Sequence, residues 1–312
     1  MGPSAESFEV FAEHRPALLQ HCYRMMGSFP DAEDVVQDTL LRAWRSRTGY
    51  TPDAPVRHWL MRIATNACLT ALASRKARSF PSLQGAPFAG ETPAIEGDAS
   101  KWLTPAPDQR LFLAPDDAAE ARESVALAFL VVLQRLPPRQ RAVLLLKDVV
   151  GWSSHDIANT LELSVPAVSS ALFRARETVA GLSKEISHEP PPAILSEYVR
   201  CWETHDLESL VKLLKEDVIL AMPPLSTWVH GARDVERFFR LPRFEAFWSL
   251  GVRAFQTRAN ALPAIAWYVR GEDGGFRRHS LEVIRFVAGA VASSTHFIGS
   301  DYLVRFEVPE QL

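Results

Sequence analysis

The chain has 312 residues, of which 47% are hydrophobic and 23% charged, and its formal net charge at pH 7 is −3. This length allows two or three domains, each with its own core, and the composition is typical of a soluble globular protein. No apolar run approaches the ~20 residues that cross a bilayer, and the N-terminus lacks the basic and then apolar pattern of a secretion signal. We therefore expect a cytoplasmic protein without membrane association.

Cysteine usage excludes two kinds of site. Cys22, Cys68 and Cys201 lie far apart, form no CxxC pair and have no histidines at ligand spacing nearby. This pattern argues against a disulfide framework and against a structural zinc site. We expect buried free thiols, no metal and no cofactor.

The first block, residues 8–80, has entirely helical patterning. Asp31 can cap a helix with an acidic first turn, and a further helix is expected from about residue 55 to 76. Residues 31–38 are acidic, whereas residues 54–90 contain no Asp or Glu at all. This separation of charge predicts two different partners on neighbouring surfaces, one of them a polyanion.

Residues 81–117 differ in composition from the blocks on either side. Pro, Gly, Ser and Ala dominate this stretch, and no helical or strand period survives in it. We expect a linker that is flexible or draped over a partner. Trp102 and Leu103 are unusual in such a linker, because exposed Trp and Leu side chains need a place to dock.

A second helical block, residues 118–183, contains the pattern of a helix-turn-helix between Leu136 and Val179. Ser153 or Ser154 can cap its first helix, and Ser164 can cap the second. The second helix repeats apolar residues at the spacing of one buried stripe: Val168, Leu172, Ala175 and Val179. An ordinary helical hairpin is the alternative, but the close approach of the two helices favours binding in the DNA major groove.

The pattern changes again beyond a proline-rich segment at residues 188–192. Amphipathic helices are expected over residues 193–214 and 232–240. Short segments of strand character cover residues 218–222, 255–261, 264–269, 278–286 and 290–297. Residues 193–312 are therefore expected to form an α+β cone, a helix and a curved antiparallel sheet that often enclose a pocket.

Three motifs in this order carry a family resemblance. They are the acid-rich helix start DAEDVVQDTLLRAWR, the basic aromatic helix VRHWLMRIATNACL, and the helix-turn-helix. Together they resemble the extracytoplasmic-function (ECF) group of sigma-70 family RNA polymerase sigma factors. The resemblance implies two all-α domains, sigma domain 2 over residues 8–80 and sigma domain 4 over residues 118–183. It further implies a chain that binds core RNA polymerase and directs promoter-specific transcription initiation without being an enzyme.

The resemblance also implies which side chains meet the polymerase. In such sigma factors the helix matching residues 31–44 docks on the clamp helices of the β′ subunit, and the β flap is a second contact. By resemblance the polymerase-binding residues are Glu33, Asp34, Gln37 and Asp38. For any single one of these residues, a solvated position on an acidic helix face is the alternative.

The helix matching residues 56–78 in this family opens and reads the −10 promoter element. Basic side chains there can neutralise phosphates, and Asn66, at the family's IAxN position, can bond to a base edge or sugar. The candidate DNA-binding residues are Arg57, Trp59, Arg62, Asn66, Arg75, Lys76 and Arg78. Trp59 either supports an unstacked base or belongs to the core. Thr70 stands where the family commonly has Asp. This departure affects the expected promoter preference and not the assignment to the class of sigma factors.

The second helix of the helix-turn-helix would enter the major groove at the −35 element. Its candidate DNA contacts are Ser169, Ser170, Arg174 and Arg176, because Arg is the commonest reader of guanine. This helix carries few cations, and Glu177 opposes approach to phosphate. We expect low affinity for DNA alone, with both promoter contacts becoming effective once the polymerase fixes their spacing.

The run MPPLSTWVHGARDVERFF, Met222–Phe239, resembles a SnoaL-like (polyketide-cyclase-like) domain. Some sigma factors of this class carry such an extension as a built-in regulator, so the resemblance implies that residues 193–312 tune activity. The sequence at Asp273–Phe276 matches the DGGG motif of one such group only in part. Candidate pocket residues for a small-molecule ligand are Trp228, His230, Trp267, Tyr268, His279 and His296.

Two other functions remain open on the sequence. One is a DNA-binding regulator fused to a cyclase- or isomerase-like enzyme or a ligand-sensing domain. A pocket with two convergent ionisable groups would favour it. The other is a one-component regulator that binds duplex DNA alone, which would not need the acidic surface at residues 31–38.

Overall fold

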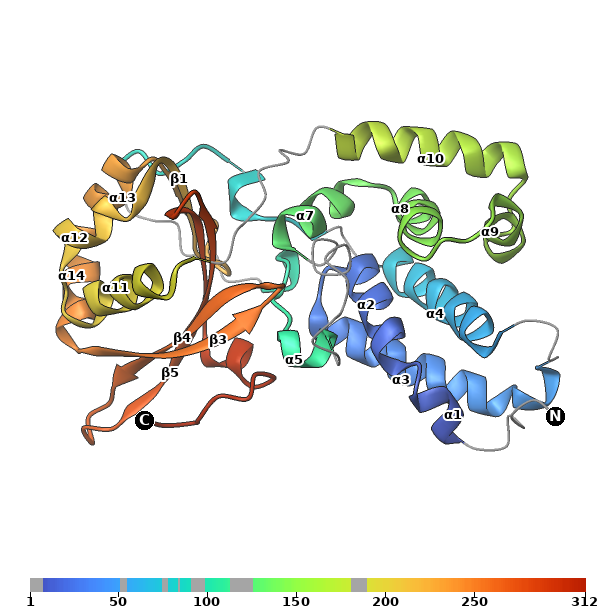
Figure 1. The fold of residues 1–312 in the computed structure, drawn as a ribbon, viewed down its shortest axis with the longest axis horizontal. Helices are drawn as coiled ribbons and strands as arrows, with labels where there is room; N and C mark the ends of the chain where they lie inside the picture. The colour runs from blue at the N-terminus through green and yellow to red at the C-terminus, as the bar shows by residue number, and fades with distance from the viewer. Residues whose placement is uncertain are drawn as a thin grey trace. The chain divides into compact units, whose positions relative to one another are not determined.

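The computed structural model describes seven segments of the chain: residues 8–50, 55–74, 78–83, 85–90, 99–112, 126–180 and 190–312. These segments fold as two compact units (Figure 1). The helical unit comprises Met1–Arg78 and Asp108–Ser183, and the α+β unit comprises Ser79–Pro107 and Lys184–Leu312. The linker predicted over residues 81–117, flexible or draped over a partner, is thus divided between the two units.

Helices alone build the first half of the helical unit: α1 (Phe8–Ala12), α2 (Arg15–Met26), α3 (Phe29–Arg45), the 3-10 turn η1 (Arg47–Gly49) and α4 (Val56–Ala73). The cap of α3 differs from the prediction. Ser28, and not Asp31, is the N-cap, and its side chain accepts a hydrogen bond from the Asp31 backbone N–H at 3.4 Å. The Asp31 carboxylate instead lies 2.6 Å from the guanidinium of Arg78.

The second half contains the helix-turn-helix. Its elements are α5 (Asp108–Leu111), α7 (Leu127–Arg135), α8 (Pro138–Leu144), the π-helix η4 (Leu145–Val149), α9 (Ser154–Leu161) and α10 (Val165–Ala180). Ser153 caps α9 by accepting from the Asp156 N–H, and Ser164 accepts from the Ala167 N–H, so both predicted caps form. Glu162 adopts the left-handed conformation between α9 and α10, with φ of 54°. The predicted stripe of α10 is buried at Val168, Leu172 and Ala175 and half-buried at Val179.

A buried arginine joins the two halves of the helical unit. The Arg141 guanidinium, on α8, donates hydrogen bonds to the Met25 carbonyl of α2 and to Gln134. Gln134 in turn donates to the Arg24 carbonyl at 3.3 Å. Burial lowers the pKa of Arg141 to about 10, so the guanidinium stays charged at neutral pH. Its donors are shared between the two halves and hold α8 against α2.

The α+β unit is built on one six-stranded sheet of order β2-β1-β6-β5-β4-β3. Its strands are β1 (Leu214–Ala221), β2 (Trp228–His230), β3 (Val252–Ala259), β4 (Leu262–Arg270), β5 (Phe276–Val287) and β6 (Ala290–Ile298). All neighbours are antiparallel except β1 and β6. Four helices lie on one side of the sheet (Figure 1): α11 (Pro192–Glu203), α12 (Leu207–Lys212), α13 (Ala232–Phe239) and α14 (Pro242–Ser249). The expected α+β fold is confirmed.

Three details of this unit differ from the sequence prediction. The helix expected over residues 193–214 is two helices, because the chain turns at His205, which has φ of 59°, and restarts at Asp206, whose carboxylate caps α12. Strand β2 was not predicted, and three residues are too few to show an alternating pattern. Helix α14 was also missed, since its eight residues follow α13 after a turn of two residues, Arg240 and Leu241.

Aromatic side chains dominate the core between the sheet and the helices. The Trp202 ring of α11 lies at their centre, with ring centroids 5.0 Å from Trp248, 5.2 Å from Phe239 and 5.3 Å from Trp267. The three cysteines of the chain are buried and free, as predicted. No helix of the described segments is both long and apolar enough to span a membrane.

Candidate nucleic-acid interface and ligand cavity

The acidic helix α3 exposes only part of the predicted polymerase-binding set. Asp34 and Gln37 are exposed. Glu33 is paired with Arg110 at 2.6 Å and Asp38 with Arg42 at 2.7 Å. Leu41 is 43% exposed and lies on the same helix face, because residues 34, 37 and 41 follow helical spacing. The prediction missed Leu41, although an apolar residue outside the buried stripe of the helix was a signal for it.

Helix α4 presents a polar face of three predicted DNA-binding residues. Arg57, Arg62 and Asn66 are exposed. Trp59 is half-buried between the rings of Phe11 and Tyr50, with centroid distances of 5.7 Å and 5.2 Å. In this structure Trp59 therefore packs against two aromatic side chains of its own unit.

Three cations after α4 were also candidates for DNA contact. Arg75 and Lys76 lie outside the described residues. The Arg78 side chain is only 10% exposed, lies 2.6 Å from the Asp31 carboxylate, and donates to the Met26 carbonyl at 3.2 Å. Arg78 thus ties the end of this domain to α2 and α3, and here it is not presented to a phosphate as predicted.

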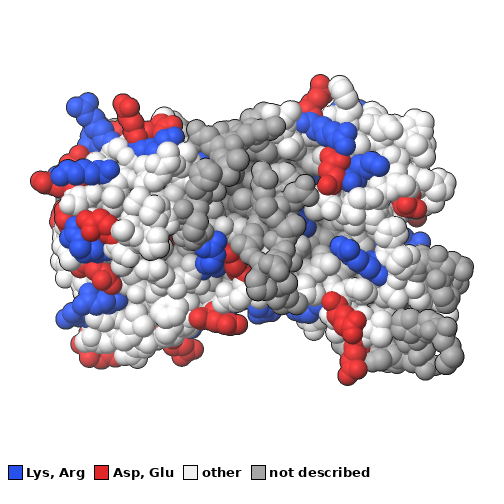
Figure 2. Space-filling view, viewed as in Figure 1, with Lys and Arg blue, Asp and Glu red and all other residues white. Residues whose placement is uncertain are grey.

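The recognition helix α10 carries little free positive charge. Ser169, Ser170 and Arg174 are exposed, and Phe173 beside them is 64% exposed. Arg176 forms two hydrogen bonds to the carboxylate of Asp148, at 3.0 Å and 2.6 Å. On the face in Figure 2, Lys and Arg side chains of the described residues are interspersed with Asp and Glu and do not merge into one basic patch. This distribution agrees with weak binding of DNA by the chain alone.

The linker between the two helical domains is docked on the α+β unit. Trp102 and Leu103 are 2% and 0% exposed, and the Trp102 indole donates a hydrogen bond to the Pro224 carbonyl at 2.8 Å. The Ala106 N–H donates to Asn260 Oδ1 at 3.0 Å, and the Asn260 N–H donates to the Ala106 carbonyl at 3.1 Å. Trp102 and Leu103 thus dock on their own chain, and this part of the linker is held against the α+β unit.

A second contact point lies earlier in the linker. The Phe88 N–H donates to the Trp228 carbonyl at 2.8 Å, and the Trp228 indole donates to the Gly85 carbonyl at 3.1 Å. The Phe88 ring meets the ring of Phe238 edge-on, with centroids 5.0 Å apart. We call these contacts, together with those of Trp102, Leu103 and Ala106, the linker dock.

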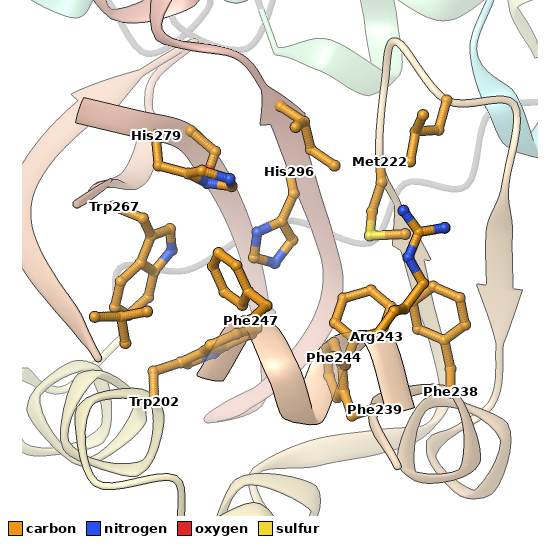
Figure 3. Close-up of a pocket in the computed structure, with 14 residues that line it drawn as sticks. Trp202, Met222, Phe238, Phe239, Arg243, Phe244, Phe247, Trp267, His279 and His296 are labelled. Carbon is orange, nitrogen blue, oxygen red and sulfur yellow. The ribbon is translucent and has the colours of Figure 1, made fainter. Parts of the chain in front are cut away.

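The α+β unit contains a partly open cavity of about 260 Å³ between the sheet, α13 and α14 (Figure 3). Six aromatic side chains line it: Trp202, Phe238, Phe239, Phe244, Phe247 and Trp267. Its polar lining is Arg243, His279, Ser280 and His296. Three of the six predicted pocket residues, Trp267, His279 and His296, are therefore brought together.

The other three predicted pocket residues lie elsewhere. Trp228 holds the linker, and His230 at the end of β2 is exposed. Tyr268 follows Trp267 on β4 and so points to the opposite face of the sheet, where its hydroxyl donates to the Pro309 carbonyl at 2.5 Å. Their positions correct the prediction for these three residues.

A β-bulge brings His279 to the cavity. Trp267 pairs with Ser280 and Tyr268 pairs with Arg278, so His279 is an extra residue on β5. A bulge re-aims side chains, and both His279 and Ser280 line the cavity. Burial, with a smaller effect from the charge of His296, lowers the pKa of His279. The His279 imidazole is therefore neutral at pH 7.

A buried carboxylate lies directly behind the histidine wall. Glu282 is 0% exposed and pairs across β5 and β6 with His296, whose Nε2 is 3.1 Å from Glu282 Oε1. It accepts hydrogen bonds from Tyr198 at 2.6 Å, Ser294 at 2.5 Å and the Trp267 indole at 2.8 Å. Burial alone would raise the pKa of Glu282, but His296 and the donated hydrogen bonds outweigh it, and the net shift of the pKa is downward. The carboxylate is therefore ionised at pH 7.

No sequence pattern predicted this network. Glu282 alternates with apolar residues on a strand predicted to be half-buried, which suggests an outward polar position. In the structure both faces of β5 are covered at this point, since Leu281 and Val283 are buried as well. Among the described residues, no group of three or more His, Cys, Asp or Glu side chains is placed to hold a metal ion.

Comparison with known proteins assigns the helical unit. Two family models match the chain, Sigma-70 region 2 over residues 10–78 and Sigma-70, region 4 over residues 126–179. The ECF RNA polymerase sigma factor SigG of Mycobacterium tuberculosis is 38% identical over 328 residues, which covers 99% of this chain and 87% of that protein. The chain belongs to the ECF sigma factor family. As a sigma factor it acts with RNA polymerase in promoter-specific transcription initiation, which sets aside a one-component regulator.

Other sigma factors resemble the chain over different lengths. The sigma factor CnrH of Cupriavidus metallidurans is 33% identical over 174 residues, covering 56% of this chain and 84% of that protein. The crystal structure of the Mycobacterium tuberculosis ECF sigma factor SigJ matches with a TM-score of 0.61 at 22% identity, covering 97% of this chain and all of that one. The likeness to SigJ shows that the fold extends over the α+β unit as well.

Proposed function

We propose that this sigma factor holds the polymerase with the exposed face of α3 formed by Asp34, Gln37 and Leu41. The partner surface is the β′ clamp helices, and the second helical domain meets the β flap. Leu41 supports this assignment, because an exposed apolar residue between polar ones is typical of an interface. Glu33 and Asp38 lie at the edge of this face, where their ion pairs to Arg110 and Arg42 can exchange for partner contacts.

The promoter contacts follow from the two exposed polar helix faces. Arg57, Arg62 and Asn66 on α4 are assigned to the −10 element, with the cations on phosphates and Asn66 on a base or sugar. Ser169, Ser170 and Arg174 on α10 are assigned to the −35 element, with Arg174 reading a base. Arg176 joins them once its pair with Asp148 opens.

The spacing of the two elements requires the helical unit to open. The element names place them about 25 base pairs apart, which is on the order of 85 Å along B-form DNA. In this structure α4 contacts α8, and α8 contacts α10. The ring of His58 on α4 also lies 4.2 Å, between centroids, from the ring of Trp152 in the segment before α9. Packed helices lie about 8–10 Å apart, so α4 and α10, which both pack on α8, lie on the order of 20 Å apart, much less than the spacing of the two elements. We therefore assign a unit packed in this way to the closed, inactive form.

The α+β unit restrains initiation through the linker dock. In the active complex the linker with Trp102 threads the polymerase between the two promoter contacts. A linker whose Trp102 and Leu103 are buried on the α+β unit is not available for that path. The burial of this pair is the observation that carries the proposal, because a linker without a binding role has no need of it.

Truncation at Pro190 tests this restraint. A chain ending at residue 189 lacks the surface on which Trp102 docks, so we expect it to keep polymerase binding and to change promoter output, with a severalfold rise in run-off transcription. Binding is measured by co-purification with core polymerase. Identical transcription and identical conformation of the truncated and full-length chains would contradict the restraint.

One observation favours a second function for the α+β unit. The cavity brings together two ionisable groups, His279 and His296, which is the condition for an acid–base enzyme. Against it, the Glu282 carboxylate is 0% exposed and occupied by its partners, so it does not reach the cavity. Mass spectrometry of a ligand recovered after incubation with the chain distinguishes catalysis from ligand binding alone. An enzyme converts the ligand, whereas a regulatory domain that only binds it returns it unchanged.

A further inference from the structure

We propose that the cavity of the α+β unit is a binding site for a planar aromatic carboxylate of one or two rings, and that its occupation strengthens the linker dock. The binding site stands on the geometry of the cavity alone. Its effect on transcription rests on the proposed restraint by the α+β unit.

The volume of the cavity sets the size of the ligand. A cavity of 150 Å³ lined by apolar side chains accommodates benzene. By proportion, the volume of about 260 Å³ found here holds about ten non-hydrogen atoms. This is the size of the fused ring pair of a two-ring ligand or of one ring with a short side chain. The carboxylate of a two-ring ligand extends beyond this volume to Arg243, which is exposed at the edge of the cavity.

The walls select a flat, apolar body. Figure 3 shows Trp202, Trp267 and Phe247 on one side of the cavity, with His279 above Phe247, and Phe238, Phe239 and Phe244 on the other, with His296 between the two groups. Aromatic rings prefer offset or edge-on contact with another ring, which contributes beyond the area buried. A planar aromatic ligand therefore meets more favourable contacts here than an aliphatic one of the same volume.

The polar groups of the lining select a negative charge. None of the residues that line the cavity in the described part of the chain is acidic, and Arg243 there forms no ion pair with any described residue. The Glu282 carboxylate is 0% exposed and is not among the lining residues, so the permanently charged side chain that lines the cavity is that of Arg243. Arg binds a carboxylate through two parallel N–H donors. We assign the carboxylate of the ligand to Arg243 and its ring to the aromatic walls.

The cavity and the linker dock share two pieces of wall. Met222 and Leu225 line the cavity, and Pro224 between them accepts the hydrogen bond of Trp102. Phe238 lines the cavity and carries the ring of Phe88. The docked linker thus supports the cavity wall at both places in this structure. A ligand that fits the cavity therefore stabilises the docked linker, and by the same coupling the docked linker raises the affinity for the ligand.

Calorimetric titration of the full-length chain with 2-naphthoate tests the binding site. The matched uncharged probe is 2-naphthalenemethanol, which has the same ring. We expect one site for 2-naphthoate and at least tenfold weaker binding of the alcohol. Arg243→Gln should remove this difference. The control is Arg240→Gln, which should preserve the difference. Arg240 lies on the neighbouring helix turn, is paired with Glu236 and does not line the cavity. No binding, equal binding of both probes, or no effect of Arg243→Gln would overturn the assignment.

Hydrogen exchange in the same chain tests the coupling. The Leu103 and Ala106 amides donate to Ser79 and Asn260 in the dock, so their exchange reports its opening. We expect at least threefold slower exchange with saturating 2-naphthoate, and a limit of about 100-fold at 100 times Kd if only the docked form binds. Binding with unchanged or faster exchange overturns the coupling. If 2-naphthoate binds and protects these amides, but the chain that ends at residue 189 and lacks the docking surface gives unchanged transcription, the proposed restraint fails and the ligand site stands.

Discussion

Asp34 and Arg174 in the helical unit lie on exposed helix faces, whereas Glu282 in the α+β unit is completely buried and held by four partners. Exposed charges contribute little to the stability of a fold and remain free to meet a partner. A buried charge is strongly destabilising when its partners are removed. The difference indicates that the helical unit uses charge for external recognition and that the α+β unit uses it to build the wall of an internal site.

The largest effect is expected from the buried charge. Glu282→Leu leaves the Tyr198 and Ser294 hydroxyls and the Trp267 indole without their acceptor, so the free energy of unfolding of the α+β unit should fall by about 3–5 kcal/mol. Urea unfolding of the full-length chain, followed by tryptophan fluorescence, measures it. Glu272→Leu in the exposed turn before β5 is the control and should change stability by less than about 0.5 kcal/mol. Equal unfolding midpoints for the two variants would contradict a structural role of Glu282.

An exposed charge should give the opposite pattern. Arg174→Ala should weaken binding of the polymerase complex to promoter DNA by about 1–3 kcal/mol and leave the stability of the chain unchanged. Arg176→Ala should have a smaller effect on binding, because the Arg176 charge is already balanced by Asp148. Dissociation constants for a promoter fragment check both variants. A larger loss from Arg176→Ala than from Arg174→Ala would show that the pair with Asp148 opens on DNA and that Arg176 is the main reader.

The smallest of these effects concerns a titratable group buried in the helical unit. His21 contacts Thr65 Oγ1 at 2.9 Å, and burial, with the charge of Arg24, lowers its pKa to about 3. A neutral His21 in the fold contributes stability above pH 6.5, and this contribution decreases as the pH falls, because the unfolded chain takes up the proton first. Between pH 7.5 and 5.5 the loss should be about 1.4 kcal/mol. Urea unfolding at both pH values measures it, and His21→Gln, which does not titrate, should lack it. A wild-type loss no larger than that of the variant would contradict the assignment.

Local sequence patterns predicted the helical unit well. The caps at Ser153 and Ser164, the buried stripe of α10 and the order of the three sigma motifs all depend on residues close in sequence. The expected cap at Asp31 was wrong because α3 begins earlier, at Phe29, with Ser28 as its N-cap, and the Asp31 carboxylate is paired with Arg78. Local patterns predict which segments are helical more reliably than the residue at which a helix begins.

The α+β unit was predicted in outline only. The Trp102 side chain bonds to a carbonyl 122 residues away, and no periodicity reports such a contact. A one-residue bulge decides that His279 faces the cavity, and the two-sided covering of β5 decides that Glu282 is buried. Each of these features depends on tertiary packing. Half of the candidate pocket residues therefore line the cavity, and of the linker dock only the requirement of Trp102 and Leu103 for a docking place was predicted.

The central claim, that the α+β unit restrains initiation by holding the linker, is tested most directly at Asn260. This residue lies in the turn between β3 and β4 with φ of 56°, so Asn260→Gly allows the same backbone conformation and removes the Oδ1 acceptor of the Ala106 N–H. Ala261→Gly in the same turn, where φ is 60°, is the matched control. Run-off transcription with core polymerase should rise severalfold for Asn260→Gly and stay at the wild-type level for Ala261→Gly. Wild-type transcription by an Asn260→Gly chain whose linker amides exchange faster would contradict the account.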